Sequence, residues 1–460
     1  MGLDLNKLYS PKRTGKTQLY EGGARTEYQR DFDRLIFSSA FRRLQNKTQV
    51  FPLPGSTFVH NRLTHSLEVS SIGRSLGKIV GTALNDKYKG TKTLSEDSIE
   101  FYKYELHQVI AAACLAHDIG NPAFGHSGEK AISNFFISSG IDKSLFTNEE
   151  WNDISNFEGN ANSIRILAGQ FNGRQPGGVK MTYTTLATIL KYPCESTGIN
   201  KSFKHLKKYG FFQAEKDIFI EIMDGLNLNR EQVSPLCYSR HPFVYLLEAA
   251  DDIAYNIIDF EDAHRIDILS SDEVKKEFLN LISCIGRPED ENTDIIATSQ
   301  NIKDDNESIS YLRSKAINAL ILQAADIFIE NLDLILEGKY NNTLIDEIEE
   351  NCGALQKIKQ ISNERIYNYK SVVELELAGY NVMNELLQTM IPSALKSKTQ
   401  RTALDSKALQ LVPIQFGEFS DKYTAYQKAL GILDFVSGMT DLYATELYRK
   451  IKGIEIGKHK

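Results

Sequence analysis

The chain has 460 residues, of which 42% are hydrophobic and 25% are charged, and this composition is typical of a globular protein rather than a disordered or fibrous one. Its formal net charge of −7 disfavours a general nucleic-acid coat, although the basic stretch KSFKHLKK (201–208) is a candidate for a local contact with nucleic acid. No apolar run is long enough to cross a bilayer, and the N-terminus lacks a hydrophobic signal core. We therefore expect a cytoplasmic protein that does not contact a membrane.

The five cysteines give no sign of a disulfide framework. They are scattered from Cys114 to Cys352, and both their odd number and their irregular spacing differ from the pattern of paired extracellular cysteines. A cytoplasm keeps such thiols reduced, so we expect reduced cysteines.

Helix signals dominate the chain. The stretch KTQVFPLP (47–54) shows the clearest alternation and predicts a short strand in a hairpin. Apolar residues recur every three or four positions over residues 62–84, 104–119, 243–264 and 308–336, which predicts four long helices. The polar stretches NGRQPGGVK (172–180) and GRPEDENTD (286–294) are typical of loops. We expect a mostly α fold with at most a few short strands, divided into an N-terminal half (1–270) and a second helical lobe (271–460).

Three of the predicted helices carry residues that can bind a metal ion. His117 and Asp118 close the apolar run VIAAACLA, so both side chains can converge on one ion just beyond the last turn. His65 lies in another helix, about one turn after Arg62 and on the same face. Asp251 lies in a third helix.

That third helix carries a polar stripe, because Tyr255 and Asp259 follow Asp251 at spacings of four on an otherwise apolar helix. Two imidazoles and two carboxylates suit Mn, Mg, Fe, Co or Ni better than a structural zinc, which usually draws on cysteine. Each feature alone has a simpler explanation: a hydrogen-bonded core histidine, a chance His-Asp dipeptide or a solvated Asp-Asp face. Together they favour a metal site, because unpaired charge is costly to bury beside apolar helices.

The order of these residues, H…HD…D, resembles the metal signature of the HD-domain phosphohydrolase superfamily. Longer stretches resemble one family within it, the deoxyguanosine triphosphate triphosphohydrolases (dGTPases). These stretches are RTEYQRDFDRLIFSSAFRRLQNKTQVF, RLTHSLEVS, AHDIGNPAFGHSGE, FEGNANSIRIL, TLATILKYP, EAADDIAYNIIDFEDA and DFVSGMTDLYATELYRKIKG. The similarity therefore runs from about residue 25 to residue 453.

The resemblance implies an HD-type helical core with an additional C-terminal helical lobe that completes the substrate pocket and the oligomer contacts. It implies a divalent metal, with Mn or Mg the first candidates, held by His65, His117, Asp118 and Asp251. His126 and Glu129 match the second catalytic pair of the family. The substrate contacts that it implies are Gln45, Arg62, Asn160, Lys191, Tyr192, Tyr255 and Asp259.

The implied reaction hydrolyses dGTP to deoxyguanosine and inorganic triphosphate, through attack of water on the α-phosphorus. A histidine near the departing 5′-oxygen suits this chemistry, because its pKa lies near neutrality. We therefore predict that His126 is the general acid and that Glu129 orients its ring. The simpler alternative is that His126 only caps the helix that follows, although Ser127 is the better capping residue type.

Several functional alternatives stay open at this point. A broader dNTP triphosphohydrolase would keep the same machinery, since the base contacts, expected within residues 365–380 or 396–413, are not identified. An HD-type phosphodiesterase or 5′-nucleotidase would share the metal ligands and release other products. A nucleic-acid-binding protein with a vestigial metal site is the third alternative. From the resemblance we also expect a homo-oligomer, with a hexamer as one form, and consider nucleic acid as an effector.

Overall fold

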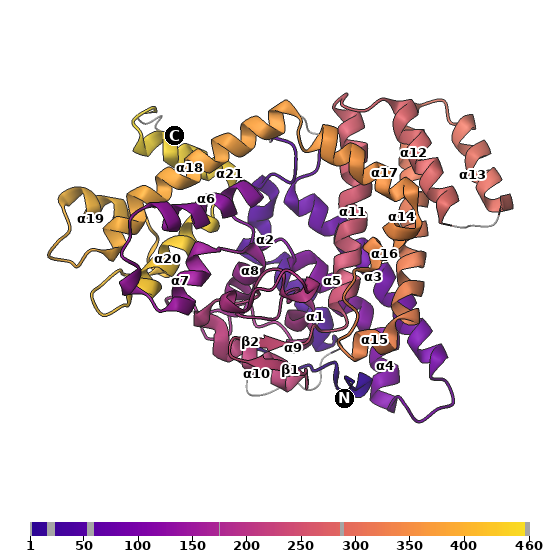
Figure 1. Ribbon diagram of the computed structural model, residues 1–460, viewed down its shortest axis with the longest axis horizontal. Helices are drawn as coiled ribbons and strands as arrows, with labels where there is room; N and C mark the ends of the chain where they lie inside the picture. The colour runs from indigo at the N-terminus through magenta and orange to yellow at the C-terminus, as the bar shows by residue number, and fades with distance from the viewer. Residues whose placement is uncertain (1, 16–23, 53–58, 174, 286–288, 456–460) are drawn as a thin grey trace.

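The computed structural model describes residues 2–15, 24–52, 59–173, 175–285 and 289–455, and this part of the chain contains 21 α-helices and two β-strands (Figure 1). The prediction of a mostly α fold with at most a few short strands is confirmed. The helices before residue 270 are α1 (Glu27–Ile36), α2 (Ser39–Arg43), α3 (Arg62–Lys87), α4 (Glu96–Tyr104), α5 (Leu106–Ala116), α6 (Gly125–Ser138), α7 (Asn148–Ser155), α8 (Gly159–Ala168), α9 (Tyr183–Ile189), α10 (Lys216–Gly225) and α11 (Val244–Arg265).

The helices after residue 270 form two groups in Figure 1, with α12–α17 at one end of the molecule and α19–α21 at the other, and the long α18 runs between them. Their bounds are α12 (Ser271–Cys284), α13 (Glu289–Asn301), α14 (Asp305–Glu330), α15 (Leu332–Leu336), α16 (Leu344–Asn351), α17 (Gly353–Ile361), α18 (Lys370–Leu395), α19 (Ala403–Gln410), α20 (Ala425–Ser437) and α21 (Asp441–Ile451).

Helices α3, α5 and α11 pack against one another at the centre of the fold. Helix α3 begins sharply, because the Asn61 side chain accepts hydrogen bonds from the backbone of Leu63 and Thr64, and the Thr64 hydroxyl accepts one from the backbone N–H of Asn61. Helix α5 is apolar on nearly every side, and nine of its 11 residues are buried. Such a helix is stable only when other elements surround it, so it becomes the core on which α3 and α11 pack.

Three glycines on one face of α3 allow this close packing. Gly73, Gly77 and Gly81 are spaced by four, so they lie above one another along the helix. A Cβ atom at Gly73 would lie 2.4 Å from Sγ of Cys114, and one at Gly81 would lie 2.0 Å from the carbonyl oxygen of Tyr102. No side chain fits in these spaces, so glycine sets the distance between α3 and the α4–α5 pair.

Buried apolar side chains form two clusters. The first joins the N-terminal segment and the central helices to most of α12–α17. The second joins α6 and α7 to α18, α20 and α21. The division of the chain at residue 270 stays a prediction.

The strand predicted over residues 47–54 is wrong for its described residues. Residues 47–52 form no strand, and only Thr48 makes an isolated bridge, to Asn61; residues 53 and 54 lie outside the described residues. The strands are instead β1 (Arg230–Val233) and β2 (Leu236–Tyr238), an antiparallel pair. Alternation did not reveal them because every residue of β1 is exposed and every residue of β2 is buried.

The predicted loops and the last predicted helix have mixed outcomes. The described residues of 172–180 contain neither helix nor strand, so that loop is confirmed. The loop expected over 286–294 is wrong from residue 289 onward, because α13 begins there; residues 286–288 lie outside the described part. The helix expected over 308–336 is present but divided at Asn331 into α14 and α15.

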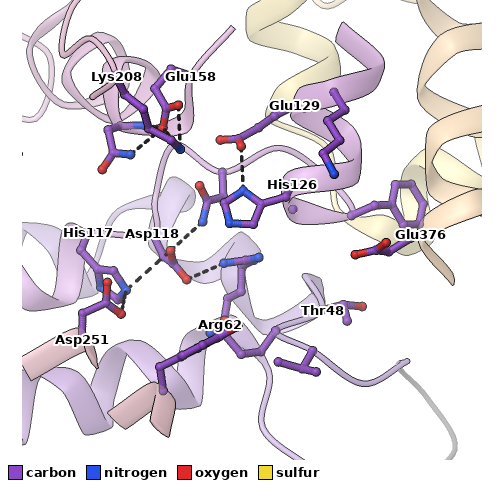
Figure 2. A pocket seen from close by; sticks show the side chains of 18 of the residues that line it. Thr48, Arg62, His117, Asp118, His126, Glu129, Glu158, Lys208, Asp251 and Glu376 are labelled. Atoms are coloured by element: carbon purple, nitrogen blue, oxygen red, sulfur yellow. Dashed lines mark hydrogen bonds and ion pairs between the residues drawn. The ribbon is translucent and has the colours of Figure 1, made fainter. Parts of the chain in front are cut away.

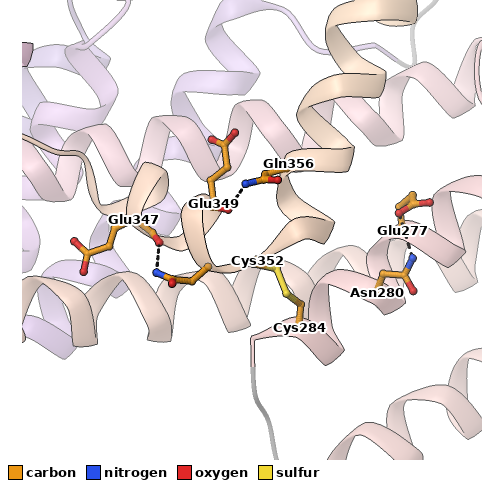
Figure 3. The surroundings of a disulfide bond; sticks show 8 residues. Glu277, Asn280, Cys284, Glu347, Glu349, Cys352 and Gln356 are labelled. Atoms are coloured by element: carbon orange, nitrogen blue, oxygen red, sulfur yellow. Dashed lines mark hydrogen bonds between the residues drawn. A yellow bond between two sulfur atoms is a disulfide. The ribbon is translucent and has the colours of Figure 1, made fainter.

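The expectation of reduced cysteines is wrong for one pair. Cys284, at the end of α12, and Cys352, between α16 and α17, form a disulfide with their Cα atoms 5.8 Å apart (Figure 3). The two residues are 68 positions apart, so spacing gave no sign of the pairing, which depends on how α12 packs on α17. The other three, Cys114, Cys194 and Cys237, are buried free thiols. None of the described helices combines the length and apolar character needed to span a membrane.

The close packing of α3 gives a testable prediction. Replacing Gly81 by alanine should lower the free energy of unfolding by about 1–3 kcal/mol, because the added methyl group meets a backbone carbonyl that cannot rotate away. Denaturant unfolding measures the change. Gly353→Ala is the control, since Gly353 is exposed in α17 and has no heavy atom within 4 Å of an added Cβ. It should change stability by less than about 1 kcal/mol; equal losses in the two variants would contradict the packing argument.

Candidate active site

A cavity of about 830 Å³ opens between the central helices and α18 (Figure 2). Its wall includes residues from α3, α6, α11 and α18, together with residues from the segments 48–50, 117–124, 157–160, 191–192 and 207–208. The wall therefore draws on parts of the chain more than 300 residues apart. Most of the residues predicted for the site line it.

The predicted metal ligands meet on one side of this cavity. Ligand atoms of His65, His117 and Asp118 all lie within 4.8 Å of one another, and all three residues are buried. Oδ1 of Asp251 lies 3.2 Å from Nε2 of His65 and 3.3 Å from Nε2 of His117. Four donors thus surround one point, as a single divalent cation requires.

The environment of His117 fits a metal ligand. Its Nδ1 lies 2.7 Å from the carbonyl oxygen of Cys114, and in this geometry Nδ1 carries the proton and donates it. The lone pair of the neutral ring is then on Nε2, which is buried and has no hydrogen-bond partner. A buried nitrogen without a partner is costly, and a cation between His117 and Asp118 would satisfy it.

Cationic side chains hold the two carboxylates of the cluster. Nη1 of Arg62 donates to Oδ2 of Asp118 at 2.6 Å, and Nδ2 of Asn121 donates to Oδ1 at 2.6 Å. Burial alone would raise the pKa of Asp118, but Arg62 and the two histidines lower it below its usual value. Burial would also raise the pKa of Asp251, but Lys191, which donates to its Oδ2 at 2.8 Å, and the two histidines together lower it well below its usual value. Both acids are therefore ionised and able to bind a cation.

His126 and Glu129 lie on the opposite side of the cavity, with Arg62 between them and the metal ligands (Figure 2). Nδ1 of His126 lies 2.8 Å from Oε2 of the buried Glu129, whose Oε1 accepts from the backbone N–H of Gly159 at 2.8 Å. Burial would raise the pKa of Glu129, but the hydrogen bond with His126 lowers it. Glu129 is thus a fixed anion that orients the imidazole of His126. The His126 side chain is 75% exposed and lines the cavity.

The structure contradicts the alternative in which His126 caps a helix. Helix α6 begins at Gly125, so His126 lies inside its first turn, and the N-cap residue is Phe124, which makes no side-chain capping bond. Phe124 has a φ of 60° and Gly125 a φ of 54°. A Cβ at Gly125 would lie 2.5 Å from Nη2 of Arg62, so glycine lets the loop lie directly against the guanidinium.

The predicted substrate contacts fall into two groups. Five of them line the cavity, namely Arg62, Asn160, Lys191, Tyr192 and Tyr255. Gln45 is exposed in the short helix Leu44–Asn46 and does not line the cavity, where Thr48, Gln49 and Val50 lie instead. Asp259 is buried beneath the wall and accepts a hydrogen bond of 3.2 Å from the hydroxyl of Tyr367, which itself stacks on Tyr255 with ring centroids 5.2 Å apart.

Three lysines of the wall were not predicted from the sequence, namely Lys130 in α6 and the neighbours Lys207 and Lys208. Lys207 and Lys208 end the stretch KSFKHLKK, which predicted only a nucleic-acid contact. Nζ of Lys208 lies 2.8 Å from Oε2 of Glu158, and Glu158 also accepts from Nδ2 of Asn160 at 2.6 Å. The signal was present as a cluster of positive charge, but nothing local showed that it faces the cavity.

Comparison with known proteins gives relatives along almost the whole chain. Residues 62–156 match the HD domain family. The chain is 36% identical over 464 residues to a deoxyguanosinetriphosphate triphosphohydrolase-like protein of Synechocystis sp., covering 99% of this chain and 100% of the relative. It is 33% identical over 483 residues to a protein with the same description from Listeria monocytogenes, covering 98% and 99%. A deoxyguanosinetriphosphate triphosphohydrolase of Yersinia enterocolitica is 32% identical over 496 residues, covering 93% and 94%.

The cluster of buried donors predicts specific metal binding. His65→Ala should weaken Mn²⁺ binding by about 100-fold, because one of the buried donors around the ion is removed. Titration of free Mn²⁺ followed by electron paramagnetic resonance measures this. His60→Ala is the matched control: His60 precedes α3, bonds Asp262 and Glu68, and does not line the cavity. An unchanged affinity in His65→Ala would remove this residue from the metal site.

Proposed function

Because this chain belongs to the deoxyguanosinetriphosphate triphosphohydrolase family of HD-domain phosphohydrolases, we propose that it hydrolyses dGTP to deoxyguanosine and inorganic triphosphate. One observation carries this proposal: the metal-competent cluster and the His126–Glu129 pair face the same cavity, which also holds several cationic side chains. A polyanionic substrate needs those cations, and the departure of an alkoxide needs an acid on the far side of the phosphorus.

His65, His117, Asp118 and Asp251 would hold the divalent ion, for which Mn or Mg are the first candidates and Fe, Co or Ni the alternatives. When bound, the ion supplies a water of lowered pKa and polarises the phosphoryl oxygens.

His126 acts as the general acid in this proposal. The fixed carboxylate of Glu129 holds Nδ1, so the ring presents Nε2 to the cavity. In its imidazolium form the ring donates its proton to the departing 5′-oxygen of the sugar. Without that proton the leaving group is an alkoxide, which departs slowly from phosphorus. The pair therefore supplies the step that ends in deoxyguanosine rather than a nucleotide.

Arg62, Lys191 and Lys208 neutralise the triphosphate. Each of them already pairs with one carboxylate, respectively Asp118, Asp251 and Glu158, so its position in the wall is fixed before the substrate arrives. Each cation retains N–H groups that the carboxylate does not use, and these can donate to phosphate oxygens. Fixed donors reduce the ordering cost of binding a flexible polyanion.

Tyr255 would lie against the deoxyribose. Its ring stacks on that of Tyr367 with an interplanar angle of 16°, and both residues line the cavity. The hydroxyl of Tyr367 bonds Asp259, so in this arrangement Asp259 supports the tyrosine pair from below. A ring lying flat beneath C2′ leaves no space for a ribose hydroxyl, which would select deoxynucleotides.

A broader dNTP triphosphohydrolase and an HD-type phosphodiesterase or nucleotidase are the alternative activities. The proposal also includes a homo-oligomeric assembly, of which a hexamer is one form. It further includes a nucleic-acid effector and a cytoplasmic location. The presence of all four proposed ligands together with the His126–Glu129 pair supports an active enzyme over a vestigial site.

The products of the reaction test the proposed function. With Mn²⁺ or Mg²⁺, dGTP should yield deoxyguanosine and inorganic triphosphate on chromatography, and a panel of dATP, dCTP, dTTP and GTP defines the base and sugar preference. His126→Ala should lower kcat by about 100- to 10,000-fold, because the general acid is removed.

The control for this variant is His205→Ala, because His205 bonds Glu231 and does not line the cavity. It should retain full activity and metal content. Release of pyrophosphate or a monophosphate would instead favour the phosphodiesterase or nucleotidase alternative. Full activity in His126→Ala would remove this residue from the mechanism.

The stacked tyrosines predict the basis of sugar selection. Tyr255→Ala should reduce the ratio of kcat/KM for dGTP over GTP by about tenfold or more, because the surface that excludes the 2′-hydroxyl is lost. Tyr369→Ala serves as control, since Tyr369 is exposed next to α18 and does not line the cavity. An unchanged ratio in Tyr255→Ala would show that another group selects the sugar.

A further inference from the structure

Two of the three free cysteines face each other outside the catalytic cluster. Cys194 and Cys237 form an isolated antiparallel bridge, flanked by backbone hydrogen bonds from Tyr238 N to Pro193 O (2.9 Å) and from Glu195 N to Leu236 O (3.0 Å). This pattern makes the two cysteines a directly opposed, non-hydrogen-bonded pair. The Cα atoms of such a pair are about 4.5 Å apart, which is within the range that a disulfide spans.

The pair is buried but thinly covered. Gly198 lies directly over it: a Cβ there would lie 3.0 Å from Sγ of Cys237 and 3.4 Å from Cβ of Cys194. Gly198 has no side chain and is only half-buried, and the neighbouring strand β1 is exposed along its length. A local opening of this turn is therefore enough to admit a small oxidant.

Cys194 is also joined to the phosphate-binding side of the cavity. Its thiol donates to the carbonyl oxygen of Lys208 at 3.2 Å, and its own carbonyl accepts from the N–H of Gly210 at 3.1 Å. Lys191, three residues before Cys194, and Lys208 both line the cavity. The hydrogen bond from the Cys194 thiol thus holds the backbone of Lys208, one of the proposed phosphate-binding residues.

We propose that Cys194 and Cys237 form a reversible disulfide, made by exchange with a small-molecule disulfide, that weakens binding of the triphosphate. Oxidation removes the thiol proton of Cys194, so the buried carbonyl of Lys208 loses its donor and the segment that carries Lys208 shifts. The disulfide itself stands on the geometry of the pair, whereas its effect on the substrate rests on the proposed function.

The exchange balances in two steps. Cys237 is the first nucleophile, because the single thiol proton of Cys194 is engaged with the carbonyl oxygen of Lys208. Its thiolate attacks the small disulfide, expels one small thiolate and forms a mixed disulfide. The thiolate of Cys194 then attacks the sulfur of Cys237 and expels the second. Two protein thiols are oxidised, one small disulfide is reduced to two thiols, and the two protons pass to the departing thiolates.

The test uses the full chain loaded with Mn²⁺ and equilibrated in buffers of reduced and oxidised glutathione. After alkylation, peptide mass mapping should find a Cys194–Cys237 cross-link that increases with the oxidised fraction and disappears with dithiothreitol. The KM for dGTP should rise about fivefold in parallel, the effect of one lost hydrogen bond, while kcat changes less. Absence of the cross-link at every ratio would overturn the proposal, and this result does not depend on whether the chain hydrolyses dGTP.

Matched variants separate the disulfide from a purely structural effect. Cys237→Ser should keep the KM of the reduced enzyme and not respond to oxidised glutathione. Cys194→Ala should raise KM without any oxidant, and Cys194→Ser, which keeps a donor for the Lys208 carbonyl, should restore it. The double variant Cys284→Ser/Cys352→Ser should still respond, because that disulfide lies in another part of the fold. A cross-link that leaves KM unchanged would overturn the coupling to the substrate.

Discussion

The candidate active site depends on the close approach of α3 to α5, which the glycine face of α3 makes possible. Gly73 lies against the side chain of Cys114, and the carbonyl oxygen of Cys114 fixes the tautomer of His117. The contact that sets the distance between the helices thus adjoins the residue that orients a proposed metal ligand. His65 is on the same helix, two turns before Gly73, so the packing that positions one imidazole also positions the other. Their ring centroids are 5.3 Å apart as a result.

Buried charge is the second constraint, and it is met by pairing. A lone carboxylate in this cavity would be strongly destabilising, and the carboxylates of Asp118, Asp251, Glu129 and Glu158 each have a cation or an imidazole as partner. In the proposed function the acids hold the ion and orient the general acid, while their cationic partners bind the substrate. The pairing that makes burial tolerable would then also hold the proposed phosphate-binding groups in place before the substrate binds.

The parts of the site that could be predicted from sequence are those encoded locally. The spacing of apolar residues predicts α3, α5 and α11. A His-Asp pair at the end of a buried helix indicates a metal site, because buried charge needs a partner. The position of Lys208 beside the cavity could not be predicted from sequence, because it depends on how the chain turns after α9. Gln45 does not line the cavity, because the chain turns at Asn46 and Thr48 lines the wall instead. The bond between Cys284 and Cys352 depends on helix packing over 68 residues, which no spacing rule contains.

The C-terminal half contributes to the candidate active site, because it holds the loops that carry the proposed catalytic residues. Asp441, at the start of α21, accepts the backbone N–H of Thr48 at 2.8 Å and that of Phe124 at 2.9 Å. Ser127 donates to the carbonyl of Glu376 in α18 at 2.6 Å.

The ammonium group of Lys47 makes a similar connection, since it donates to the carbonyls of Asn121 and of Ser437 at the end of α20. Burial lowers the pKa of Lys47 to about 7. The two hydrogen bonds of its amine are with carbonyl oxygens rather than with a carboxylate. The loop between His117 and His126 is therefore held at Asn121 and Phe124, and at the adjoining Ser127, by bonds that involve α18, α20 and α21. The residues before α12 alone would keep the proposed metal ligands, but the loop that leads to His126 would lose these partners. The cavity therefore needs α18 as well as the helices of the N-terminal half.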